Sequence, residues 1–163
     1  MQPNFKSILF AAGLGNDTGY VLDHALSLAQ KYQARIYVIY GHETMDFTAQ
    51  NMAELYMFQA ELVDSIENSL QERERQIRGQ LERICHERLE KLGADESLIA
   101  GIDIARKPAK QAILDAVADY RADLIVMGAH RHSVLSDALL GSTTMKILHS
   151  APVPVFVVRL PSS

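Results

Sequence analysis

Two glycines and three hydroxyl side chains near the end of the chain are the residues best suited to hold a ligand. Gly128 follows an apolar run, and Gly141 directly precedes Ser142, Thr143 and Thr144. Glycine lets a backbone approach a ligand closely, and the start of a helix offers unpaired amides and the positive end of its dipole. The pattern indicates a site for phosphate or another anion, although isolated glycines more often simply end a strand or begin a helix.

Basic side chains concentrate near these glycines only at His130, Arg131 and His132. An arginine can donate to phosphate as a two-pronged fork, or its bulk can fill a groove that glycine would leave open. The two histidines could face one anion, yet exposed loop histidines without a role are more common. Both interpretations of Arg131 therefore stay open.

Residues for covalent or metal-assisted chemistry form no known pattern in this sequence. It has no nucleophile placed beside a base, no paired carboxylates and no Gly-Lys-Ser/Thr phosphate loop. Cys85 and His86 are neighbours on a predicted helix, where adjacent side chains point in different directions and do not easily share one ion. We predict no catalytic residue and no metal site, and an enzyme is the less favoured interpretation.

The composition describes one folded domain that spans residues 1–163. Hydrophobic residues make up 48% of the chain and charged residues 22%, a balance typical of globular proteins. The net charge of −4 argues against nucleic acid as a partner. Cys85 is the single cysteine, which fits a reducing compartment, and no apolar run is long enough to span a membrane. We expect a cytoplasmic protein that binds neither nucleic acid nor membrane.

Alternating strands and helices must position these residues. Apolar runs predict strands at residues 8–12, 36–40, 99–104, 124–127 and 153–158. Apolar residues at helical spacing predict helices at residues 18–32, 51–92, 108–120 and 142–150. Strands that are apolar on both faces and alternate with helices are typical of an α/β protein with a five-stranded parallel open sheet and helices on both faces. Ligands collect beyond the carboxyl ends of such strands.

The predicted helix at residues 51–92 is too long for a small sheet. At ~1.5 Å per residue an unbroken helix of this length would extend past the strands, so part of it should project or meet a partner. Its middle, residues 71–78, is dense in Glu and Arg. A solvated face with local ion pairs is favoured there over a dedicated interaction arm.

The segment from Met127 to Thr144, with the tail from Lys146 to Val158, resembles the universal stress protein family. The signature of that family is a glycine, two residues, a glycine, nine residues, a glycine and then Ser or Thr. In the ATP-binding members of the family it wraps the phosphates and ribose of the nucleotide. Gly128 and Gly141-Ser142 match it in register. The resemblance implies a Rossmann-like fold of the adenine nucleotide alpha hydrolase type. The residues that it assigns to nucleotide binding are Ala12, Gly13, Gly41, Met127, Gly128, Arg131, Gly141, Ser142, Thr143 and Thr144.

Three positions depart from the nucleotide-binding pattern of the family. Arg131 stands where the middle glycine is expected. Gly13 stands where the family has an acidic residue that contacts the nucleoside, and Gly41 replaces an apolar residue that lines the adenine pocket. These departures remove a nucleoside anchor and offer less surface to a base.

The resemblance implies a stress-response protein that acts as a dimeric sensor or regulator. Its ligand would be ATP or a related adenine nucleotide, with or without Mg²⁺, bound at the loop after the fourth strand. The apolar last strand, residues 155–158, suggests a homodimer formed at the sheet edge. Two alternatives are a dimeric scaffold of the same fold whose groove Arg131 closes, and a slow metal-assisted nucleotide hydrolase.

Overall fold

Five parallel strands form one sheet in the order β3-β2-β1-β4-β5. The structure is a computed structural model, and it describes residues 2–43, 53–54, 56–57, 59–129 and 140–161. The strands are β1 (Ser7–Ala11), β2 (Arg35–Gly41), β3 (Ile99–Ala105), β4 (Leu124–Gly128) and β5 (Val155–Val158). Every neighbouring pair is parallel, so the predicted five-stranded parallel sheet is confirmed.

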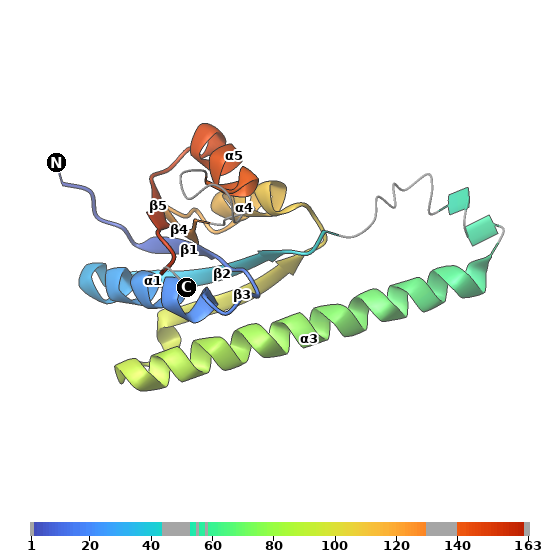
Figure 1. Cartoon of the computed structure of the whole chain (residues 1–163), viewed down its shortest axis with the longest axis horizontal. Helices are drawn as coiled ribbons and strands as arrows, with labels where there is room; N and C mark the ends of the chain where they lie inside the picture. Colours follow the sequence, from blue (N-terminus) through green and yellow to red (C-terminus); the bar gives the residue numbers. More distant parts are fainter. Residues whose placement is uncertain (1, 44–52, 55, 58, 130–139, 162–163) are drawn as a thin grey trace.

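Helices cover both faces of the sheet, as predicted (Figure 1). On one face lie α1 (Thr18–Tyr32) and α3 (Ala60–Leu92). On the other face lie α4 (Ala109–Asp119) and α5 (Ser142–Ser150). A short 3₁₀ turn, Glu96–Leu98, precedes β3. Within the described ranges, no helix is long and apolar enough to cross a membrane.

The strands are apolar on both faces because each face has its own core. Ile8 and Phe10 belong to the cluster under α1 and α3, whereas Leu9 between them belongs to the cluster under α4 and α5. All five residues of β4 are buried. Successive strand residues point to opposite faces, so a strand packed on both sides needs a continuous apolar run.

Within the segment predicted as a long helix, residues 53–54 and 56–57 are helical, and α3 then runs without a break from Ala60 to Leu92. Gln59 caps its start with non-helical backbone angles (φ −152°, ψ 68°), and Gly93 ends it in the left-handed region (φ 66°) that favours glycine. Its 33 residues span roughly 50 Å, against about 23 Å for the seven residues of β3. The expectation that part of this helix projects is met, because its first half passes beyond the ends of β2 and β3 (Figure 1).

Two arginines attach α3 to β3. The Arg106 guanidinium, just after β3, donates two hydrogen bonds of 2.9 Å to the Glu67 carboxylate. Its Nε also donates to Glu74, about two turns further along α3. Arg78 of α3 donates from Nη1 to the backbone carbonyl of Ile102, at 2.8 Å. These contacts hold the helix along the outer strand and occupy a carbonyl of that strand.

The pair formed by Arg106 and Glu67 should make stability depend on pH. The hydrogen bond from Arg106 lowers the pKa of Glu67. A lowered carboxyl pKa stabilises the fold above the unfolded pKa of about 4.3, and this contribution is lost as pH falls through the folded pKa. Glu67→Gln should therefore cost about 0.5–1 kcal/mol at pH ~7 and nearly nothing at pH ~3, measured by urea unfolding.

Glu72→Gln provides the matched control for that measurement. Glu72 lies on the same helix but pairs with Arg75 on the outer surface, where both side chains are mostly exposed. Its substitution should change unfolding little at either pH. An equal, pH-independent cost for both variants would contradict the assigned role of Arg106.

Candidate functional site

The start of α5 is fixed to the end of β4 by one buried side chain. Thr144 is fully buried, and its hydroxyl donates to the carbonyl oxygen of Gly128 over 3.4 Å. Gly141 is the N-cap residue of α5, and no side chain caps the helix through it. Ser142 is exposed and Thr143 half-buried in the first turn. The contact therefore places the start of α5 beside the carboxyl end of β4, an arrangement that favours anions.

The loop after β1 is shaped by the hydroxyl of Thr18. This oxygen lies 2.9 Å from the carbonyl oxygens of both Gly13 and Gly15. The Ala12 amide donates to the Ile39 carbonyl at 2.9 Å, which continues the sheet pairing past the strand and uses that amide internally. Asp17 is the N-cap of α1 but makes no side-chain capping bond. The loop therefore curls over the start of α1 without help from Asp17.

A small cavity of about 80 Å³ brings Gly13 and Gly128 together. Its wall consists of Phe10, Ala11, Gly13, Gly15, Asp17, Thr18, Val21, Gly128 and Leu160. A Cβ atom built on Gly128 would lie 3.0 Å from a methyl of Val21 and 3.4 Å from a methyl of Leu160. A side chain at position 128 would require Val21 or Leu160 to shift by a few tenths of an ångström, because α1 and the C-terminal tail approach the backbone closely.

Gly41 lies outside this cavity and serves packing between elements. A Cβ atom at this position would come within 2.7 Å of the Ala109 Cα and 3.0 Å of the Lys107 carbonyl oxygen. The neighbouring amide of His42 donates to the Ala105 carbonyl at 2.7 Å. The backbone between β3 and α4 thus fills the space into which a side chain at position 41 would extend.

The cations that follow β3 are engaged in ion pairs. Arg106 binds the two glutamates of α3, and the Lys107 ammonium lies 2.6 Å from a carboxylate oxygen of Asp115. The hydrogen bond from Lys107 lowers the pKa of Asp115. Both side chains hold helices in place, which reduces the positive charge that this loop offers to a ligand.

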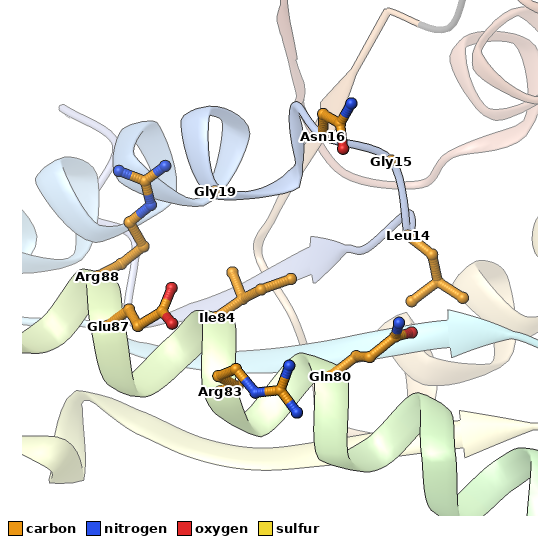
Figure 2. A pocket seen from close by; sticks show the side chains of 9 residues that line it. All are labelled: Leu14, Gly15, Asn16, Gly19, Gln80, Arg83, Ile84, Glu87 and Arg88. Carbon is orange, nitrogen blue, oxygen red and sulfur yellow. The ribbon is translucent and has the colours of Figure 1, made fainter.

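A larger cavity of about 300 Å³ opens on the outer side of the loop after β1, between that loop and α3 (Figure 2). Its wall consists of Leu14, Gly15, Asn16, Gly19, Gln80, Arg83, Ile84, Glu87 and Arg88. The Arg88 guanidinium lies against Gly19 and pairs with Asp23 at 3.4 Å, so it closes one end. Gly15 lines both cavities, which makes the loop the partition between them.

The predicted site residues have several different surroundings. Met127 is buried and packs in the core under α4 and α5, so only its backbone reaches the sheet edge. Arg131, with His130 and His132, lies outside the described residues. Val21 and Leu160 line the cavity but were not predicted from the sequence. No sequence pattern marks Leu160 as a site residue, because its position depends on the path of the chain after β5.

Solved structures with this arrangement define a class of parallel α/β protein. The hypothetical protein MJ0577 superposes with a TM-score of 0.71 at 21% identity, and the match covers 99% of this chain and 100% of that chain. A universal stress protein in complex with cAMP gives a TM-score of 0.66 at 14% identity, covering 98% of this chain and 100% of that chain. At these identities the likeness establishes the fold.

The chain belongs to the Universal stress protein family, whose model matches residues 4–159. Universal stress protein A homolog 2 of Coxiella burnetii is 28% identical over 162 residues, which cover 98% of this chain and 99% of that relative. The family resemblance based on Gly128 and Gly141-Ser142 is therefore confirmed.

An apolar side chain introduced at position 41 should destabilise the fold. In Gly41→Val the new side chain would press on the backbone of Lys107 and Ala109, which cannot swing away as a flexible side chain would. Overpacking of this kind costs about 1–3 kcal/mol. Urea unfolding of the variant should show a loss in that range.

Gly101→Val is the matched control, because Gly101 lies in the adjacent strand β3 and is only partly buried. A Cβ atom there would meet only a Tyr37 ring carbon at 3.8 Å, an ordinary contact. A valine also favours strand geometry, so this variant should be as stable as the unmodified chain or more so. If Gly41→Val were equally well tolerated, the close packing assigned to position 41 would be wrong.

Proposed function

We propose that the protein is a regulator that binds ATP or a related adenine nucleotide at the carboxyl edge of the sheet. The observation that carries this proposal is the buried contact between Thr144 and Gly128, which places the start of α5 beside the end of β4. Unpaired amides and the positive end of the helix dipole attract phosphate. The family match to residues 4–159 adds support.

The phosphates would bind at the first turn of α5. Ser142 is exposed and Thr143 half-buried, so their hydroxyls are available as donors, whereas the Thr144 hydroxyl is directed at the Gly128 carbonyl. The nucleoside would extend toward the cavity between Gly13 and Gly128. Because Gly13 has no carboxylate, the ribose would gain less there than from the acidic residue of the family.

A fold neighbour supports the class of ligand. A universal stress protein with a TM-score of 0.66 to this chain is in complex with cAMP, an adenine nucleotide. The identity between the two chains is 14%, so the likeness of their folds is the support that it gives. Binding of ATP by this chain therefore requires a direct measurement.

Gly141→Asp should weaken ATP binding by at least about tenfold without unfolding the protein. Aspartate is a favourable N-cap residue, so α5 keeps its start, while the added negative charge faces the phosphates. Isothermal titration with ATP, with and without Mg²⁺, measures the loss, and thermal melting shows that the fold is intact.

Gly141→Asn separates charge from bulk, because asparagine caps a helix as well as aspartate does and carries no charge. We expect it to bind ATP within about threefold of the unmodified chain. Absence of ATP binding by both the unmodified chain and Gly141→Asn at millimolar nucleotide would refute the proposal.

We further propose that two copies pair through the edge strand β5. Phe156 on this strand is 40% exposed, and Tyr20 on α1 is 39% exposed. The His24 ring lies between them, 4.9 Å from the Tyr20 ring and 6.4 Å from the Phe156 ring, measured between centroids. An exposed aromatic patch beside an unpaired strand edge favours a two-fold interface.

Phe156→Glu should convert the dimer to a monomer, because two like charges would meet close to the axis. Sedimentation equilibrium gives the mass directly. Leu62→Glu is the matched control, since Leu62 is 45% exposed on the projecting part of α3, away from β5. A monomeric unmodified chain, or an equal effect of both variants, would rule out β5 as the interface.

A second candidate function is a dimeric scaffold of the same fold that binds no nucleotide. It is favoured by the side chains of Val21 and Leu160, which cover Gly128 and leave a cavity of about 80 Å³. Closure of the groove by Arg131, one of the two interpretations of that residue from the sequence, concerns a residue outside the described ranges. The titration with ATP separates the two candidates.

A further inference from the structure

The chain beyond β5 runs directly beside the end of β4. Val158, the last residue of β5, pairs with Gly128 in the sheet register. Ala129 then donates its amide hydrogen to the Val158 carbonyl at 2.9 Å, which keeps the two backbones together past the strands. Residues 159–161, here called the C-terminal strap, therefore start at the edge where the proposed ligand site lies.

Leu160 of the C-terminal strap contacts this site. Its side chain is partly buried against the core cluster that contains Val21. A methyl of Leu160 would lie 3.4 Å from a Cβ atom on Gly128, and the side chain forms part of the cavity wall. The position of the strap is thus set by apolar contacts with α1 and by the sheet pairing of the residue before it.

The cavity is too small for a nucleoside while Leu160 occupies its wall. Its volume is about 80 Å³. Pockets that enclose ligands of drug size measure about 300–1,000 Å³. The other apolar side chain against Gly128, Val21, is part of helix α1 and cannot leave without unfolding that helix. Leu160 follows the last strand of the sheet, so it can move while the sheet stays intact.

We propose that the C-terminal strap is an autoinhibitory element and that the Leu160 side chain must leave Gly128 before a nucleoside can enter. This inference depends on the nucleotide binding proposed above and names the regulation of that site. The closed strap reduces the apparent affinity by the fraction of molecules that are open. Only the nucleoside end of a ligand is affected, because the start of α5 does not line this cavity.

Leu160→Ala should raise the affinity for ATP by about tenfold, because the smaller side chain gives up most of the apolar contact that holds the strap closed. Isothermal titration of the full chain measures this change. Inorganic tripolyphosphate is the second probe, and its affinity should be the same for both chains because it lacks a nucleoside.

Two further variants control for side effects. Leu160→Met keeps an apolar side chain of similar volume, so it should bind ATP as the unmodified chain does. Leu92→Ala removes a leucine that is 45% exposed at the end of α3, and it should also leave the affinity unchanged. Thermal melting of each variant shows that the fold is retained.

The outcomes separate the strap from the site that it covers. If the unmodified chain and Leu160→Ala bind ATP equally, the strap is not inhibitory, while nucleotide binding stands. If Leu160→Ala gains affinity for tripolyphosphate as much as for ATP, Leu160 does not act on the nucleoside end. If neither chain binds ATP, the proposed function fails and the regulation fails with it.

Discussion

Gly128 is in contact with three parts of the molecule at once, and the carboxyl edge of the sheet depends on this contact. Its carbonyl accepts the hydroxyl of Thr144 from α5, while Val21 of α1 and Leu160 of the tail lie against its α-carbon. A larger residue would require the Val21 or Leu160 side chain to shift. The glycine that fits the family signature is therefore also a packing residue, so the same position sets both the fold and the shape of the candidate site.

Positive charge at this edge is divided between side chains and backbone. The cations just after β3, Arg106 and Lys107, bind carboxylates of α3 and α4. At the start of α5, the proposed phosphate site, the helix backbone would add its own attraction for an anion. A chain with a net charge of −4 can thus present a local anion site without a broad basic surface.

The sequence predicted the helices and strands well, but it did not predict the contacts between them. The helices at 18–32 and 142–150 have the predicted ends, and each strand was found within two residues, because local periodicity reports a buried face. The pairing of Arg106 with α3, the backbone packed on Gly41 and the position of Leu160 escaped prediction. Each of these contacts joins segments that are distant along the chain. A local sequence pattern does not show which distant segments come into contact.

The two edges of the sheet are not equivalent in what they offer to another strand. At β3 the long helix runs alongside, and the guanidinium of Arg78 already occupies a carbonyl of the strand. At β5 the edge is short and carries the exposed ring of Phe156. If copies pair through β5 as proposed, α3 beside β3 leaves less room for a strand at the opposite edge, so strand addition would end at a closed pair.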